Sequence, residues 1–98
     1  MRIITYKDWE NEFPSYVIIR KEGYFYAAHN SSAVAINRVI GYKIFIDEYG
    51  RETIGGSSLK KIEASLKHHG IRYVVVGGNT IISRFDSGCS FEQASVRG

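Results

Sequence analysis

The side chains that could support acid–base or metal chemistry are few and poorly spaced for it. Asp47 and Glu48 are adjacent, and because successive side chains of a strand point to opposite faces, these two carboxylates do not easily share one ion. Glu52 lies across an expected hairpin and could join Asp47 in a small metal-dependent nuclease site. No Glu-x-Lys pattern follows to complete such a site, so the nuclease is only an alternative.

The other reactive groups fit structural roles better than catalytic ones. His68 and His69 are neighbours near an expected helix end, whereas helical metal ligands are spaced i and i+4. Cys89 is the only cysteine, which excludes an internal disulfide and a thiolate zinc cage. Gly55–Ser58 precedes a helix and offers free amides, but it lacks the lysine and spacing of a P-loop. We therefore expect no enzyme, no catalytic residue, no metal and no cofactor.

The stretch from Arg20 to His29 is the most informative part of the sequence. Three consecutive aromatic residues, Tyr24 to Tyr26, follow Gly23, and in a strand they place large rings on both faces of the sheet. Either both faces are covered and the rings are core, or one ring stays exposed beside basic residues. An exposed ring there could stack on, or wedge between, nucleic-acid bases.

The composition is that of one folded domain with a mild basic bias. Of 98 residues, 44% are hydrophobic and 23% charged, and 13 Lys and Arg stand against 10 Asp and Glu, a balance compatible with nucleic acid but not diagnostic of it. No apolar run reaches the roughly 20 residues of a membrane span, and the start lacks the apolar segment of a signal peptide. We expect a cytoplasmic protein without membrane contact.

Three helices are predicted from caps and apolar spacing. Thr5 should cap a short helix that ends before Pro14, with Asp8 in the capping-box position. Asn30–Ser32 supplies N-caps for a helix over Ala33–Ile40. A third helix should begin at Leu59 and be closed by Gly70, with an outer face made of Lys60, Lys61, Glu63, Ser65, Lys67 and His68.

Apolar alternation and glycine turns predict five or six strands. They are Tyr16–Arg20, Tyr24–Ala28, Tyr42–Asp47, Arg51–Ile54, Tyr73–Val76 and Thr80–Phe85. The run Tyr73–Val76 is typical of a strand covered on both faces. We expect a single α+β (mixed α/β) domain over residues 1–85, with a mixed sheet packed against the three helices, and a flexible tail over residues 86–98.

Taken together, these stretches resemble the amino-terminal mismatch-recognition domain of the MutS DNA mismatch repair proteins. That family has a short helix and then a strand reading apolar-apolar-x-Arg-x-Gly-Asp-Phe-Tyr-Glu; the sequence from Val17 to Ala27 is similar, with one extra residue between Arg20 and Gly23. The Ala-containing helix and the segment from Ile54 to Val76 also follow the family order. The resemblance covers roughly residues 5–80 and implies the fold of that domain.

In that family a phenylalanine is wedged beside a mispaired base in kinked DNA, and a glutamate two residues later hydrogen-bonds the base. The resemblance gives the wedge role to Phe25. Ala27 stands at the position of this glutamate, and Tyr24 stands where the family has an aspartate before the phenylalanine. These two departures weaken the expectation of mismatch selectivity more than the expectation of the fold. The clamp, connector and ATPase domains of MutS are absent, and no Walker motif occurs.

We therefore expect a non-enzymatic module that binds mismatched or bent double-stranded DNA, with protein partners that supply the missing domains. The expected DNA-binding residues are Phe25, Tyr24, Tyr26, Arg20, Lys21, His29, Lys60 and Lys61. The alternative is a protein–protein interaction or self-association module that keeps the fold but has lost mismatch recognition. The sequence leaves the oligomeric state open.

Overall fold

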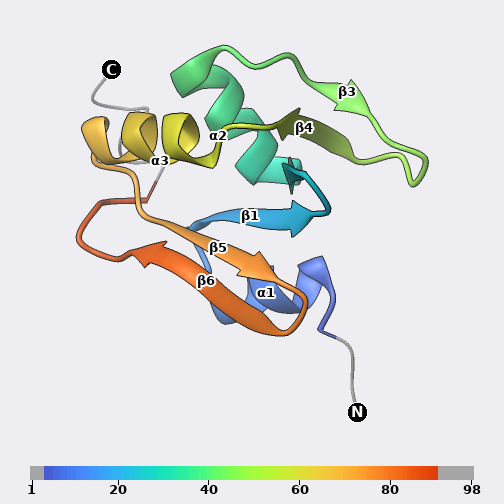
Figure 1. The fold of residues 1–98 in the computed structure, drawn as a ribbon, viewed down its shortest axis with the longest axis horizontal. Helices are drawn as coiled ribbons and strands as arrows, with labels where there is room; N and C mark the ends of the chain where they lie inside the picture. The colour runs from blue at the N-terminus through green and yellow to red at the C-terminus, as the bar shows by residue number, and fades with distance from the viewer. Residues whose placement is uncertain (1–3, 91–98) are drawn as a thin grey trace.

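The structure, a computed structural model, describes residues 4–90 and consists of three helices and one six-stranded sheet (Figure 1). In chain order the elements are α1 (Tyr6–Glu12), β1 (Val17–Glu22), β2 (Phe25–His29), α2 (Asn30–Ile40), β3 (Phe45–Ile46), β4 (Glu52–Gly56), α3 (Leu59–His68), β5 (Tyr73–Gly77) and β6 (Thr80–Phe85). The strand order is β3-β4-β2-β1-β5-β6, with β1 and β5 parallel and the other neighbours antiparallel. The expected α+β domain with a mixed sheet is confirmed.

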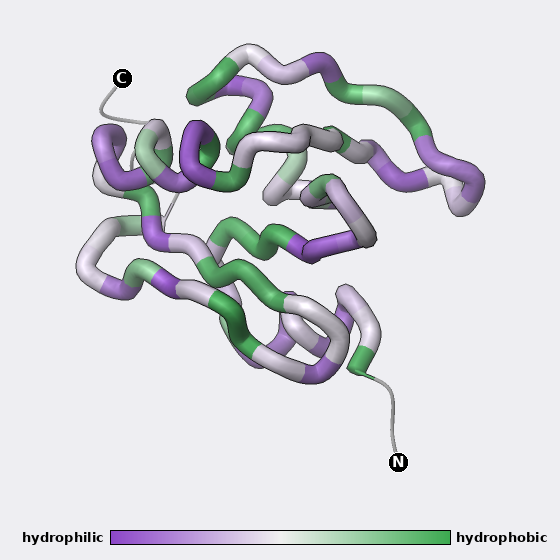
Figure 2. Tube along the Cα trace, viewed as in Figure 1, coloured by the Kyte–Doolittle hydropathy of each residue, from purple (hydrophilic) through white to green (hydrophobic). Residues whose placement is uncertain are grey.

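The two central strands are buried on both faces. Val17–Ile19 of β1 and Tyr73–Val76 of β5 are inaccessible to solvent, and Figure 2 shows hydrophobic residues along both strands. Because side chains alternate along a strand, one set packs with α2 and α3, and the other packs with α1. The prediction from the apolar run of β5 is therefore confirmed.

Helix α1 is short but tied firmly to the sheet. The Thr5 hydroxyl accepts a hydrogen bond from the Asp8 amide at 3.2 Å, and the Asp8 carboxylate accepts one from the Thr5 amide at 2.9 Å, which is the predicted capping box. The Tyr6 hydroxyl donates to the Ile18 carbonyl at 2.7 Å and accepts from the His29 amide at 3.1 Å. This one side chain links α1 to β1 and to the end of β2.

Helix α2 begins earlier than expected, and Asn30–Ser32 does not cap it. The helix starts at Asn30, with His29 as N-cap residue and no side-chain cap hydrogen bond. Ser32 is buried, and its hydroxyl accepts from the Ile18 amide at 2.9 Å. A buried backbone amide needs a hydrogen-bond acceptor. The Ser32 hydroxyl is that acceptor for β1 and does not cap the helix.

The third predicted strand is mostly not a strand. Only Phe45–Ile46 pairs with β4, and Tyr42 and Ile44 pack against the core cluster under α2 and α3. The side-chain amide of Asn37 donates a hydrogen bond to the Tyr42 carbonyl at 2.8 Å. This carbonyl therefore bonds to α2 instead of to a neighbouring strand. In the view of Figure 1 the β3–β4 hairpin projects beyond the ends of the other strands.

The outer face of α3 is less uniformly solvated than predicted. Glu63 is half-buried, and its carboxylate accepts hydrogen bonds from the Tyr73 hydroxyl at 2.7 Å and from the Ser83 hydroxyl at 2.8 Å. It therefore joins α3 to β5 and β6. Among residues 4–90, none of the helices combines the length and apolar character that crossing a membrane requires.

The predicted tail needs correction at its start. The Cys89 amide donates to the Gly70 carbonyl at 2.7 Å, and the Arg72 amide donates to the Cys89 carbonyl at 3.0 Å. Ser90 is buried. The packed domain thus extends beyond Phe85, because these residues cover the connection between α3 and β5. The rest of the predicted tail, residues 91–98, lies outside the described residues.

Candidate nucleic-acid interface

Half of one sheet face is left open. On this face α1 packs over β1 and β5, where its Tyr6 and Trp9 join a cluster with Ile18, Val74 and Val76. On β2 and β4 the same face borders a hollow of about 400 Å³. A helix of seven residues is too short to cover a six-stranded sheet, because each helical residue adds only about 1.5 Å of length.

Phe25 stands at this hollow with half of its surface exposed. Its exposed fraction is 48%, and its ring lies over Gly55, whose missing Cβ would be 4.0 Å from Cδ2 of Phe25. Glu22 is its partner in the strand register, so the two side chains share the open face. Sequence alone could not decide between a buried and an exposed Phe25; the structure places the ring outward.

The two neighbouring tyrosines do not share this surface equally. Tyr24 occupies the β1–β2 turn after Gly23 and is 99% exposed. Tyr26 points to the opposite face and packs against the core cluster under α2 and α3. Tyr24 can therefore reach a ligand at the strand end, whereas Tyr26 belongs mainly to the core side.

Two arginines flank the open face, and both are paired with carboxylates. Arg20 forms an ion pair with Glu22, and its guanidinium lies 5.9 Å from the centre of the Tyr6 ring. The Arg51 Nε donates to the Asp47 carboxylate at 2.9 Å, and its guanidinium lies 5.4 Å from the centre of the Tyr49 ring. The positive charge beside Phe25 is thus largely balanced by nearby negative charge.

The predicted lysine contacts lie away from Phe25. Lys21 follows Arg20 in β1 and so points to the opposite face of the sheet. Lys60 and Lys61 lie on α3, which packs on that opposite face, and the Lys61 ammonium lies 5.8 Å from the centre of the Tyr42 ring. The structure therefore brings Arg20 and Phe25 together but does not bring these lysines to them.

His29 is buried, which corrects the expectation that it contacts the DNA backbone. Its exposed fraction is 3%, and the Tyr6 ring meets it edge-on at 4.8 Å between ring centres. Burial lowers the pKa of His29, and the positive charges of Arg51 and Arg20 lower it further against the opposing effect of Asp47. A neutral, covered imidazole is not a phosphate contact.

The two ring nitrogens of His29 have different surroundings. Nδ1 lies 2.9 Å from the Thr53 hydroxyl, which in turn lies 3.1 Å from the Arg51 carbonyl. Nε2 is buried and has no hydrogen-bond partner among residues 4–90. Asp47 is 3.7 Å from Nδ1, too far for a hydrogen bond.

Three residues of the open face were missed by the sequence analysis. Phe45 and Tyr49 are large exposed side chains of the β3–β4 hairpin that line the hollow, and Arg51 lines it from the same hairpin. The pattern Tyr49-Gly50-Arg51 predicts the turn but not its position. Only the pairing of β4 with β2, from Tyr26 to His29, sets the hairpin beside Phe25.

The suggested carboxylate pair does not form. Phe45 and Thr53 are partners in the register, so Asp47, two residues after Phe45, shares the open face, whereas Glu52, next to Thr53, faces the other way. Hydrogen bonds from Arg51 and Tyr49 lower the pKa of Asp47 in spite of the opposing effect of desolvation. Within residues 4–90 no group of three or more His, Cys, Asp or Glu side chains could hold a metal ion.

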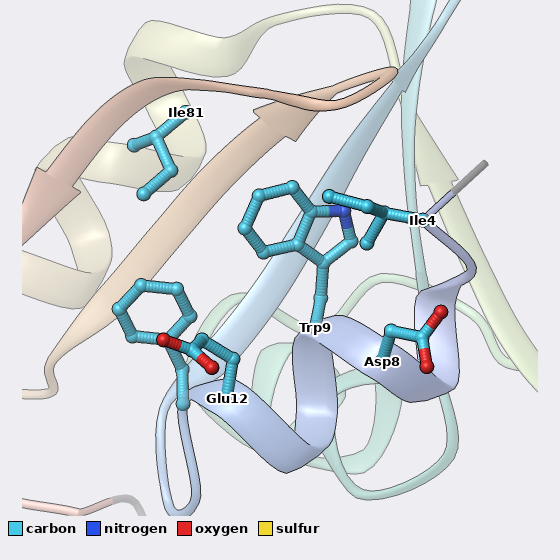
Figure 3. Close-up of a pocket in the computed structure, with 6 residues that line it drawn as sticks. Ile4, Asp8, Trp9, Glu12 and Ile81 are labelled. Carbon is cyan, nitrogen blue, oxygen red and sulfur yellow. The ribbon is translucent and has the colours of Figure 1, made fainter. Parts of the chain in front are cut away.

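A second hollow lies beside α1, where Ile4, Trp9, Phe13 and Ile81 surround about 570 Å³ (Figure 3). Asp8 and Glu12 stand on the α1 side of this hollow. Two carboxylates at its rim make it a poor site for a phosphate, since like charges repel. The hollow at Phe25 also has carboxylates in its lining, but Arg20 and Arg51 line it as well, whereas no basic residue among residues 4–90 lines the hollow beside α1. The hollow at Phe25 is therefore the better candidate for nucleic acid.

No protein-family model matches the chain, and a search of curated proteins finds no significant match. The resemblance to the MutS domain therefore stays an expectation from the sequence, drawn from residues 17–27, 32–41 and 54–76.

Proposed function

We propose that this protein is a non-enzymatic DNA-binding module that inserts Phe25 at mismatched or kinked duplex, in the manner of the MutS domain that it resembles. The observation that carries the proposal is the half-exposed Phe25 ring on an uncovered part of the sheet, with Arg20 on the adjacent strand. An apolar ring that enters a base step replaces part of the lost stacking, and unstacking costs only a few kcal/mol, least at a mismatch.

The turn between β1 and β2 supports this mode of binding. Gly23 has a φ of +64° and Tyr24 is 99% exposed, so the strand pair ends in a narrow tip with Phe25 just behind it. Minor-groove binders commonly insert such apolar wedges while arginines contact the surrounding backbone. Arg20 and Arg51 would take that role here once DNA phosphates compete with Glu22 and Asp47 for them.

The residue at the family's glutamate position shapes the expected selectivity. Ala27 is buried in the floor of the open face and can neither donate nor accept a hydrogen bond through its side chain. The module should therefore respond to how easily a base step kinks, rather than to the identity of the mispaired base.

A protein–protein interaction or self-association module is the second candidate, and one observation favours it. Arg20 and Arg51 are already paired with carboxylates, while the apolar side chains Phe25 and Phe45 remain exposed. A charge-balanced surface with exposed rings is also what protein interfaces use.

Titration of mismatched, matched and single-stranded oligonucleotides at low and moderate salt tests the proposal. We expect the affinity to rank mismatched above matched duplex, and to fall steeply between about 50 and about 200 mM salt because counterions are released from the duplex. Light scattering with and without duplex serves as the comparison. If the protein forms a dimer whose stability does not depend on salt, and if this dimer does not bind duplex, the second candidate function is favoured over the first.

A further inference from the structure

The two edges of the sheet differ in how well they are protected against pairing with another strand. β6 forms one edge, where a bulge at Ile82 and the charge of Arg84 interrupt the strand. β3 forms the other edge, and its residues Phe45 and Ile46 are 53% and 63% exposed. In the view of Figure 1 no helix or strand of residues 4–90 lies beyond β3. Because native proteins usually protect edge strands with charges, prolines or bulges, the apolar edge at β3 is the one available to another strand.

The backbone hydrogen bonds of the β3–β4 hairpin show which groups of β3 face this edge. The Asp47 amide donates to the Arg51 carbonyl at 3.0 Å, so these two residues form a hydrogen-bonded pair. Such pairs alternate with non-hydrogen-bonded pairs along an antiparallel ladder, and Phe45 therefore turns its N–H and C=O toward β4. The N–H and C=O groups of Ile44 and Ile46 consequently point outward, where no strand of residues 4–90 pairs with them.

The side chains around β3 divide between the two faces of the sheet. Phe45 lines the open face, whereas Ile44 packs against the core cluster under α2 and α3. Ile46 lies two residues after Ile44 and therefore shares its face, although most of its surface is exposed. Each face of β3 thus presents one exposed apolar side chain at the outer edge.

A second copy of the chain fits this edge in a register that serves both faces. When two β3 strands meet antiparallel with Phe45 opposite Phe45 of the second copy, Ile44 stands opposite Ile46 of the second copy. The outward backbone groups then form hydrogen-bonded pairs, and the two Phe45 residues form a non-hydrogen-bonded pair, in which side chains are closest. Each exposed Ile46 is covered by Ile44 of the other copy. The same register sets Lys43 opposite Asp47 of the second copy, so the charges are complementary.

We propose that the protein forms a symmetric dimer in which two β3 strands pair antiparallel about a two-fold axis and join the two sheets into one. Because Phe45 faces Phe45 on the same side, this axis is perpendicular to the sheet, and the two open faces, each with its Phe25, lie on one side of the dimer. The contact is isologous and involves few residues. It is therefore smaller than a standard stable interface, and we expect a dissociation constant of about 1–100 µM. The inference goes beyond both candidate functions, since the dimer needs no DNA.

Sedimentation equilibrium of the full chain over a range of concentrations tests the dimer. We expect the mean mass to rise from that of one chain toward that of two as the concentration passes the dissociation constant. Phe45→Lys removes the contact between the rings and sets two ammonium groups directly opposite each other, so it should weaken the dimer by at least about tenfold. Ile82→Lys is the matched control, since it places the same charge at an exposed apolar residue of the other edge strand, and it should dimerise like the unmodified protein. Circular dichroism checks that both variants are folded.

Introduced cysteines test the register of the two strands. Cys89 is first replaced by serine, so that only the introduced thiol can cross-link. Under oxidising conditions Phe45→Cys should form a disulfide-linked dimer, because the Cβ atoms of a directly opposed pair are close enough for a disulfide. Ile46→Cys is the neighbouring control. Its two copies lie diagonally across the strand pair, about 7–8 Å apart, so they should cross-link far more slowly.

Three results would each overturn the inference. The first is a chain that stays monomeric up to about 1 mM, at which even a weak dimer should form; an edge that pairs only with a strand of another protein would give this result. The second is a Phe45→Lys variant that dimerises as tightly as Ile82→Lys. The third is equal cross-linking of Phe45→Cys and Ile46→Cys. None of them decides the proposed function, which the oligonucleotide titration tests separately.

Discussion

Replacing Phe25 separates its role in binding from its role in folding. Its side chain is 48% exposed. Burying an apolar side chain fully stabilises the fold by about 1.5–3 kcal/mol, so Phe25→Ala should lower the free energy of unfolding by about half of this, or about 1 kcal/mol. That loss should lower the melting temperature by roughly 4–8 °C in a domain of this size. A domain with ordinary stability of about 5–15 kcal/mol stays folded after such a loss.

The effect on DNA binding should be larger and of a different origin. A ring stacked against a base contributes about 1–3 kcal/mol, so Phe25→Ala should weaken binding to mismatched duplex roughly 5- to 150-fold. Phe25→Trp keeps a flat ring and should retain most of the affinity. Fluorescence anisotropy gives the affinity, and thermal and urea denaturation give the stability of the same preparations.

Ile82 offers a matched control on β6, because its exposed fraction is also 48%. Ile82→Ala should cost a similar amount of stability and leave DNA affinity unchanged. Our reasoning would be refuted if Phe25→Ala lost the roughly 2–5 kcal/mol typical of a truncated core residue. Equal DNA affinities of Phe25→Ala and Ile82→Ala would refute it as well.

Three further predictions concern the scaffold. Ser32→Ala should lower the free energy of unfolding by about 1–3 kcal/mol because it leaves a buried amide without an acceptor, whereas Ser31→Ala at the exposed neighbour should change it by no more than about 0.5 kcal/mol; urea denaturation measures both. Gly88→Ala should cost about 1–3 kcal/mol, since the new methyl group would lie 2.6 Å from a backbone carbonyl oxygen, while Gly55→Ala, with nothing closer than 4.0 Å, should be almost neutral; equal melting temperatures would contradict this. Burial lowers the pKa of His29 in the folded protein, so below a pH of about 6.5 the unfolded chain binds a proton that the folded chain does not. The free energy of unfolding should therefore fall as the pH drops, by at most about 1.4 kcal/mol per pH unit. Denaturation at several pH values should show a weaker dependence of the unfolding free energy on pH in His29→Gln.

Much of the fold could be predicted because local patterns determine it. The Thr5–Asp8 capping box uses only residues within one turn, and it forms as expected. The β-branched run of β5 requires burial on both faces, whatever its neighbours are. These features depend on residues close in sequence, which is why the sequence alone indicates them.

The open face could not be predicted, because it depends on contacts between distant segments. Whether Phe25 points outward is set by the register of β1 with β2, and a shift of one residue would exchange Phe25 with Tyr26. Arg51 reaches the hollow only because β4 pairs with β2. His29 was expected to contact DNA, but packing with Tyr6 from α1 buries it.

The parallel pairing of β1 with β5 has a consequence for how the chain folds. β1 can form its hairpin with β2 early. Its other edge pairs with β5 (Tyr73–Gly77), which lies near the end of the described chain. Contacts that close so long a loop form slowly. While a ribosome is still extending the chain, the apolar residues of β1 therefore lack a lasting partner on that side, and β1 should be the segment that a chaperone engages first.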